Sequence, residues 1–414
     1  MLVALLSVFS VGCTEDMFDD LKGFIGVGND DVNVNVNVPN NQIWYTTNND
    51  KPLSFNNVYA FGVNILSNVY DAENQCWIIT FDGVVTTIGD YAFYNCTTLK
   101  SVTIPNSVTT IGYYAFQGCS SLTSVTIPNS VTTIGMAAFF YCSSLTSITI
   151  PDSVTTIEGG AFYNCYRITS ITIPDSVTTI GGLAFCECSS LTSVTIGDSV
   201  TTIGEKAFYN CSSLRSVTIP DSVTTIGTAA FTCCSSLTKI NGKFASDDGR
   251  CLIVDGTLNS FAPAGLTEYT IPEGVTTIGE GAFSKCYSLT SITIPDSVTT
   301  IGDEAFYYCS SLTTVTIPDG VTTIGEYAFS LCDNLLGVSI PRSVVEIGSG
   351  AFFYCGQLST VYCKAIIPPA VGDIVLDGNA SNRKIYVPNE SVETYKSAAG
   401  WCDYAHKIWG YNFE

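Results

Sequence analysis

Hydrophobic and polar positions along this chain follow one pattern that returns every 23 residues. In the copy AFYNCSSLRSVTIPDSVTTIG (207–227), Val217 and Ile219 alternate with Ser216 and Thr218. Alternation with a period of two places the apolar side chains on one face and the polar side chains on the other. The pattern therefore predicts a short β-strand in each copy, with its apolar face in a core.

The residues around the strand predict how each copy turns back on itself. Pro220 ends the strand because it cannot donate the next ladder hydrogen bond, and Ile226 returns to the core. Ala207, Phe208 and Cys211 have spacings that place them on one face of a short helical turn. One copy cannot bury this apolar surface alone. Neighbouring copies must therefore stack, with their strands about 4.8 Å apart in a parallel sheet.

The isoleucine of the motif VTTIG marks eleven copies and shows where the array is interrupted. The markers are 23 residues apart in a block of seven and again in a block of four: Ile88, Ile111, Ile134, Ile157, Ile180, Ile203 and Ile226, then Ile278, Ile301, Ile324 and Ile347. Between the blocks the chain holds 29 residues more than one period. A fixed period over this length predicts a solenoid. We place units 1–7 at 84–240 and units 8–11 at 266–363.

The segments outside the array predict an insertion and two caps. Asp-Gly turns between apolar runs in 241–265 predict a β-hairpin insertion, which either carries function or is a degenerate repeat. The runs NQIWYTT and NQCWIITFDG predict an N-terminal cap over 41–83, preceded by a flexible, low-complexity tether over 14–40. The strand KIYVP and the helix-forming ESVETYKSAAG predict a C-terminal cap over 364–414.

One cysteine lies eight residues after each marker, and this phase predicts its role. The eleven repeat cysteines are Cys96, Cys119, Cys142, Cys165, Cys188, Cys211, Cys234, Cys286, Cys309, Cys332 and Cys355. The phase faces inward beside alanine and phenylalanine, where a small apolar residue fits, and free cysteine is among the most buried residue types. A zinc site needs convergent ligands, and disulfide frameworks are typical of small domains. We interpret these cysteines as core, with metal binding and disulfides as the alternatives.

The consensus LxSVTIPxSVTTIGxxAFxxCxS closely resembles the BspA-like, TpLRR class of leucine-rich repeats. The resemblance covers 84–363 and, with the end segments, most of the chain. It implies a right-handed solenoid with a parallel β-sheet, short helical turns and β-rich or helical caps, displayed on a microbial surface. Several members of the class are adhesins that bind host matrix proteins or other cells. The resemblance therefore implies a binding role without naming the ligand.

The beginning of the chain predicts export and anchoring. The apolar run MLVALLSVFSVGC stops at Cys13, and 1–13 resembles a bacterial lipoprotein signal that ends in a lipid-modified cysteine. The acidic residues that follow resemble the export tag of surface-exposed lipoproteins. We therefore expect an outer-membrane lipoprotein at the cell surface that contacts the membrane only through its lipid. An ordinary cleaved secretion signal, and thus a secreted protein, is the alternative.

Charge and histidine content exclude several function classes. The chain has 37 acidic and 16 basic residues, and the net charge of −21 repels phosphate backbones, which excludes nucleic-acid binding. His406 is the only histidine, so no catalytic triad or histidine–metal cluster forms in the array. Acidic residues after the repeat prolines form a row that we interpret as a solvated edge, with calcium bridging as the alternative. We expect no enzyme activity, no cofactor and no metal site.

Aromatic residues at two variable positions of the repeat form the candidate binding surface. They lie before the conserved alanine or between the conserved phenylalanine and cysteine. The members of this aromatic stripe are Tyr94, Tyr114, Phe140, Tyr163, Tyr209, Tyr307, Tyr327 and Phe353. Exposed rings offer a large contact area at little entropic cost, so they suit contact with protein or carbohydrate. The alternatives are that these rings only pack between rungs, or that the outward serine and threonine row of the strand is the contact face.

We therefore predict an adhesive binding protein that contacts host matrix proteins or proteins of a neighbouring cell. The alternative is a structural or accessory surface lipoprotein that captures glycans. Both are non-enzymatic, and we expect a monomer.

Overall fold

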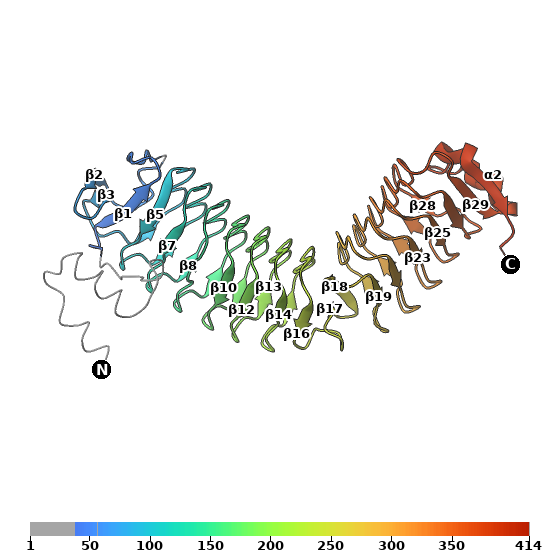
Figure 1. Ribbon diagram of the computed structural model, residues 1–414, viewed down its shortest axis with the longest axis horizontal. Helices are drawn as coiled ribbons and strands as arrows, with labels where there is room; N and C mark the ends of the chain where they lie inside the picture. Colours follow the sequence, from blue (N-terminus) through green and yellow to red (C-terminus); the bar gives the residue numbers. More distant parts are fainter. Residues whose placement is uncertain (1–37, 56, 414) are drawn as a thin grey trace. The chain divides into compact units, whose positions relative to one another are not determined.

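A computed structural model describes residues 38–55 and 57–413 of the chain, and Pro39–Glu414 form one compact unit. The predicted signal 1–13, with Cys13, and most of the predicted tether 14–40 lie outside the described residues. None of the described helices is long and apolar enough to cross a membrane. The repeats stack turn upon turn (Figure 1), which confirms the predicted leucine-rich-repeat solenoid.

The marker isoleucines pair with one another in a parallel ladder along the first block. Thr87 pairs with Thr110 and Ile88 with Ile111, and the same register continues to Ile226. The strands of this ladder are β4 (Thr87–Ile88), β6 (Thr110–Ile111), β8 (Thr133–Ile134), β9 (Thr156–Ile157), β11 (Thr179–Ile180), β13 (Thr202–Ile203) and β15 (Thr225–Ile226). The sequence placed these isoleucines in the core but did not predict that they lie in strands.

The predicted alternating strands form a second parallel arrangement. Their inward residues pair in register, as Val217 does with Ile240. These strands are β5 (Leu99–Thr103), β7 (Ser124–Thr126), β10 (Ser170–Ile173), β12 (Ser193–Ile196), β14 (Ser216–Thr218), β16 (Lys239–Asn241), β19 (Glu268–Thr270), β21 (Ser291–Thr293), β23 (Thr314–Thr316), β25 (Gly337–Ile340) and β27 (Thr360–Cys363). Their positions confirm the predicted strand in these copies, whereas residues 147–150, between β7 and β10, form no strand.

The segment between the two strands is a series of tight turns and not the predicted helical turn. Lys206 and Asn210 both have positive φ, 54° and 55°, which a right-handed helix does not allow. The N–H of Phe208 donates to the carbonyl oxygen of Ala230 in the next unit at 2.8 Å, and the N–H of Cys211 donates back to the carbonyl of Phe208 at 3.3 Å. Hydrogen bonds between units therefore alternate with bonds inside the unit, which prevents a helix.

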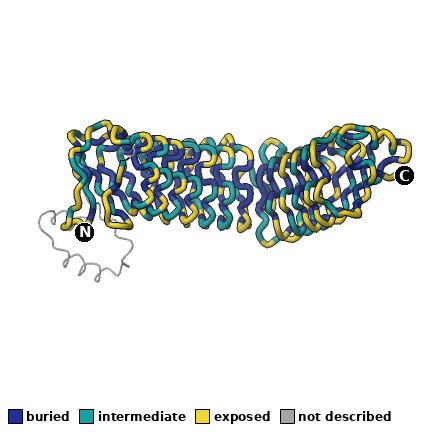
Figure 2. The backbone as a smooth tube through the Cα atoms, turned by 90° about the horizontal axis from the view of Figure 1, so that it is seen from above, coloured by how far each residue is buried: buried dark blue, intermediate teal, exposed yellow. Residues whose placement is uncertain are grey.

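Phenylalanine rings stack along the inside of the array. In the first block, successive ring centroids are 5.0 to 5.3 Å apart and the planes are within 10° of parallel. The rings of this stack are Phe93, Phe116, Phe139, Phe162, Phe185, Phe208 and Phe231, and every one of them is buried. Buried positions run through the inside of every turn (Figure 2). Each unit therefore completes the core of its neighbour, as a repeat array requires.

The repeat cysteines are buried free thiols, which confirms their interpretation as core. The thiol of Cys211 donates to the carbonyl oxygen of Phe185, one unit earlier, at 3.2 Å. The same bond recurs at Cys119, Cys142, Cys165, Cys188, Cys234, Cys309, Cys332 and Cys355. Burial raises the pKa of the Cys165 and Cys355 thiols to about 12, so they stay protonated. Each thiol thus packs as a small apolar group and joins two units.

Antiparallel strands close the N-terminal end of the stack. The strands are β1 (Gln42–Thr47), β2 (Ile65–Asp71) and β3 (Cys76–Phe81). β1 pairs antiparallel with both β3 and β5, so the edge of the second arrangement is covered at this end. Without β1, the outer edge of β5 would present unpaired N–H and C=O groups.

The C-terminal end continues the ladders and then adds a short helix. Its elements are β28 (Ala370–Val371), β29 (Lys384–Pro388), the 3-10 helix η1 (Asn389–Ser391), α2 (Val392–Ser397), the 3-10 helix η2 (Cys402–Lys407) and β30 (Ile408–Tyr411). The buried Trp401 donates its indole N–H to the carbonyl of Pro369 at 2.8 Å, which ties the helix to the last turn. β29 pairs with β27 and β30 pairs with β29, both parallel.

Candidate functional site

All eight residues of the aromatic stripe are half-buried. They lie on the turns between the two strands of each unit, where their backbones bond to the neighbouring units. Phe140 stacks on Tyr163 with ring centroids 4.6 Å apart and planes 15° from parallel. Tyr141 contacts both rings, at 4.7 and 5.9 Å, and is 45% exposed. Phe140 and Tyr163 therefore belong to a packed group of rings with an exposed neighbour.

The stripe is interrupted along the array. In five units, the position directly after the conserved phenylalanine holds a residue that is not aromatic: Gln117, Cys186, Thr232, Ser284 and Ser330. Rings therefore gather in separate groups, and the largest gap lies where the two blocks meet.

Tyr209 is a stripe residue near this gap, and neighbouring side chains partly cover it. Burial raises the pKa of its hydroxyl, and Lys285 places its ammonium 6.0 Å from the ring centroid. Tyr209 is thus less available to a partner than the group around Phe140.

The junction between the blocks contains the predicted insertion, and part of it takes the place of a rung. β17 (Cys251–Val254) and β18 (Thr257–Phe261) pair antiparallel as a hairpin. β18 then pairs parallel with β20 (Thr277–Ile278), so Leu258 lies beside a marker isoleucine. The ladder continues through β22 (Thr300–Ile301), β24 (Thr323–Ile324), β26 (Glu346–Ile347) and β28. β15 ends the sheet of the first block and β17 ends the sheet of the second block, so the ladder breaks here.

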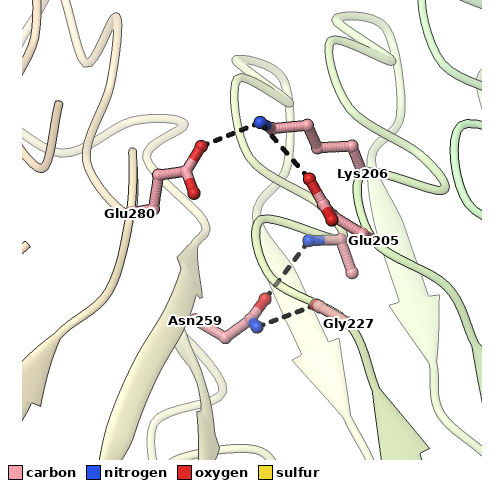
Figure 3. Close-up of polar contacts among 6 residues, drawn as sticks. Glu205, Lys206, Gly227, Asn259 and Glu280 are labelled. Atoms are coloured by element: carbon pink, nitrogen blue, oxygen red, sulfur yellow. Dashed lines mark hydrogen bonds and ion pairs between the residues drawn. The ribbon is translucent and has the colours of Figure 1, made fainter. Parts of the chain in front are cut away.

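At this break, polar side chains form hydrogen bonds that backbone groups form between the other neighbouring units. Asn259 accepts a hydrogen bond from the N–H of Ala230 at 3.3 Å and donates to the carbonyl of Gly227 at 2.9 Å (Figure 3). The Oγ of Ser260 accepts from the N–H of Phe231 at 3.1 Å. Both side chains are buried, so they satisfy backbone groups that water does not reach.

An ion pair also spans the junction. The Nζ of Lys206 lies 2.8 Å from Glu280 and 3.6 Å from Glu205 (Figure 3). The side chains are 30%, 40% and 64% exposed, so solvent screens these pairs and each contributes about 0–1 kcal/mol. The ion pair borders a pocket of about 300 Å³, which Tyr209 and Ser284 also line. The buried amide of Asn259, and not this ion pair, is therefore the stronger link between the blocks.

A second group of rings, which was not predicted from the sequence, lies at the C-terminal end of the sheet. We call it the C-terminal platform and define it by Tyr362, Tyr386, Trp409, Tyr411 and Phe413. The outward serine and threonine row could have indicated this group, because Tyr362 follows Ser339 by one period and pairs with it. The row then continues into β29, where Tyr386 pairs with Tyr362. Trp409 and Tyr411 lie in β30, which falls outside the repeat phase.

The acidic row after the repeat prolines lies at exposed turns. Along it, the N–H of Asp198 donates to the carboxylate of Asp175 at 2.9 Å. Asp175 therefore satisfies a backbone donor of the neighbouring unit. Among residues 38–55 and 57–413, no group of three or more histidine, cysteine, aspartate or glutamate side chains is arranged to hold a metal ion.

Comparison with known proteins relates the chain to bacterial leucine-rich repeats. A family model described as the BspA type leucine rich repeat region matches 63–191, 155–245 and 257–368. A leucine-rich cell surface protein from Faecalibacterium prausnitzii is 30% identical, with a TM-score of 0.63 over 88% of this chain and 97% of that protein. A leucine-rich repeat protein from Bacteroides ovatus is 29% identical, with a TM-score of 0.52 over 84% and 92%.

A more distant structure shares the fold. The pneumococcal vaccine antigen PcpA is 20% identical, with a TM-score of 0.57 over 80% of this chain and 85% of the antigen. No curated protein sequence matches this chain.

The junction can be tested at Asn259. The Asn259→Ala substitution leaves the N–H of Ala230 and the carbonyl of Gly227 unsatisfied in a buried place. We expect a loss of about 1–3 kcal/mol in the free energy of unfolding, measured by urea denaturation. The control Asn334→Ala removes an exposed amide that donates to Ser310 and is expected to cost less than about 0.5 kcal/mol. An Asn259→Ala protein that unfolds at the wild-type urea concentration would contradict the assigned role.

Proposed function

Because this chain belongs to the BspA-type leucine-rich repeat family, we propose that it is a non-enzymatic binding protein that mediates adhesion at the cell surface. The family indicates a role in protein interaction, and its structurally similar member from Faecalibacterium prausnitzii is named a cell surface protein. The proposed partners are host matrix proteins or proteins of a neighbouring cell. Contact is made through the aromatic stripe and the exposed rings beside it.

The observation that carries this proposal is the group of rings around Phe140. Phe140, Tyr141 and Tyr163 pack against one another, and Tyr141 projects into solvent. The backbone of Tyr141 donates to the carbonyl of Tyr163 at 2.9 Å, so the group stands on a fixed frame. Rings held in place lose little entropy on binding, and buried aromatic anchors dominate the energy of protein interfaces.

The proposed anchor is a lipid at Cys13. The apolar run that ends at this cysteine and the acidic residues after it support the assignment. A lipid at the N-terminal end leaves the array free of the membrane, with its turns available to partners. A single acyl chain binds membranes weakly, so a stable anchor needs more than one chain.

The binding surface is tested by replacing the three clustered rings. We expect the Phe140→Ser, Tyr141→Ser, Tyr163→Ser triple variant to bind at least about 30-fold more weakly to whichever purified extracellular-matrix protein the wild type captures. Surface plasmon resonance measures the affinity, and urea denaturation verifies that the buried Phe139 and Phe162 still hold the fold. A matched triple variant, Thr126→Ser, Thr149→Ser, Thr172→Ser, alters the outward row and should bind normally. Normal binding by the ring variant together with lost binding by the threonine variant would move the contact to the sheet face.

The anchor is tested by Cys13→Ala. Full-length protein expressed in a bacterium is expected to partition into detergent, because acyl chains bury hydrocarbon there, whereas Cys13→Ala is expected to stay in the aqueous phase. Phase partition followed by immunoblotting gives the result. If the two proteins partition alike, the chain has no lipid at Cys13, and secretion after signal cleavage replaces the proposal.

A further inference from the structure

The outward face of the sheet changes character at its C-terminal end. Along most of the array the outward position of the strand is a threonine or serine. In the last strands the row runs from Ser339 in β25 to Tyr362 in β27, Tyr386 in β29 and Trp409 in β30, which pair in register. β29 and β30 lie beside α2 at the end of the stack (Figure 1). Polar side chains suffice to cover a solvated sheet, so three successive rungs with large outward rings indicate another task.

Four of the five platform rings pack against one another, and the ammonium of Lys384 lies over the ring of Trp409. Tyr362 stacks on Tyr386 with centroids 5.2 Å apart and planes 20° from parallel. Tyr411 contacts both edge-on, at 5.3 and 5.7 Å, and Phe413 lies 4.9 Å from Tyr411. Trp409 and Tyr411 still expose 53% and 43% of their surface. The platform is thus preorganised, and a ligand that covers it immobilises little.

A polar groove of about 1290 Å³ borders the platform. The charged side chains that line it are Arg342, Lys364 and Asp319, and Ser339 and Ser343 add hydroxyl groups. The guanidinium of Arg342 donates to the carbonyl of Phe413 at 3.5 Å. Within the described part of the chain, neither cation forms an ion pair. Among the described residues that line the groove, two cations thus stand beside one carboxylate.

This positive charge is unusual for the chain. The protein carries −21 overall, with only 16 basic residues in 414. Among the described lining residues, Arg342 and Lys364 are accompanied by one carboxylate, that of Asp319, and the ammonium of Lys384 lies 5.7 Å from the ring centroid of Trp409. An anionic ligand is attracted to such a patch and repelled by the rest of the molecule, so the charge pattern favours one place of binding.

We propose that the C-terminal platform and its groove bind an acidic carbohydrate. A sugar ring presents a C–H face that packs on Trp409 or Tyr411 and hydroxyl groups that bond to Ser339, Ser343 or Asp319. Its carboxylate or sulfate groups meet Arg342 and Lys364. The groove combines charged and hydroxyl side chains with the rings of Tyr362, Tyr411 and Phe413, which matches a ligand that has anionic groups, hydroxyl groups and C–H faces. The site lies apart from the aromatic stripe, so it stands whether or not the stripe binds a protein.

The test is isothermal titration of the whole protein with three probes: an oligogalacturonate, a sulfated heparin-type oligosaccharide and a neutral galactan oligosaccharide. We expect one or both acidic probes to bind, the neutral probe to bind at least about tenfold more weakly, and acidic binding to weaken as NaCl rises from about 50 to about 200 mM. Binding of only one acidic probe identifies whether carboxylate or sulfate is read. Equal binding of the neutral probe, or no binding of any probe, overturns the proposal.

Two variants assign the binding to this corner. The Arg342→Gln, Lys364→Gln double variant is expected to weaken acidic binding about tenfold or more, because it removes two charge-assisted contacts. The Lys100→Gln, Arg167→Gln double variant makes the same change of net charge at exposed positions in the first block and is expected to bind normally. Equal losses in both variants would show that only net charge matters and would overturn the assignment.

Tyr411→Ser tests the contribution of the rings, and a peptide probe tests the class of ligand. Tyr411→Ser is expected to weaken binding of the acidic oligosaccharide about tenfold, while urea denaturation reports whether the cap remains folded. A poly-glutamate peptide carries the same charge without sugar rings and is expected to bind more weakly than the oligosaccharide. Tighter binding of the peptide would identify an acidic-peptide site in place of a carbohydrate site.

Discussion

The array depends on one shared acceptor, the backbone carbonyl of the buried phenylalanine in each unit. The carbonyl of Phe185 accepts the N–H of Cys188 in its own unit at 3.3 Å and the thiol of Cys211 in the next unit at 3.2 Å. Two lone pairs are thereby used inside a dry core. Alanine at the cysteine position would leave one lone pair unsatisfied, and serine would bring a more polar hydroxyl on a shorter bond. This constraint accounts for the thiol in nine of the eleven units, whereas Cys96 and Cys286, in the first unit of each block, are buried core residues that do not form this bond.

The same constraint positions the surfaces on which binding is proposed. Because each phenylalanine ring stacks on the next, the turns that carry the aromatic stripe follow one another at a fixed spacing near 5 Å. At the junction the regular acceptors are missing, and the buried Asn259 and Ser260 supply them from side chains. At the C-terminal end the ladder continues into strands whose outward residues are rings. At the junction, side chains thus take the place of backbone acceptors, and at the C-terminal end, rings take the place of the outward polar residues.

The fold could be predicted from the sequence because its determinants are local and repeated. The markers Ile88 and Ile111 are one period apart and pair directly in the structure. The prediction of a helical turn in each unit was wrong. The positive φ of residues such as Lys206 depends on hydrogen bonds to the next unit, which the sequence of a single copy does not reveal. The C-terminal platform was missed because Trp409 joins the row only through the pairing of β30 with β29. Contacts of this kind depend on register between segments that do not repeat.

Alkylation of the thiols tests the central claim most directly. The native protein is treated with iodoacetamide at neutral pH, and labelled peptides are identified by mass spectrometry before and after unfolding in urea. Among the described cysteines only Cys402 is exposed, so it is expected to react at once, whereas the repeat cysteines should react only at the rate of unfolding. Rapid alkylation of the repeat cysteines in the native protein, or their recovery in disulfides, would contradict a core joined by buried thiol–carbonyl hydrogen bonds.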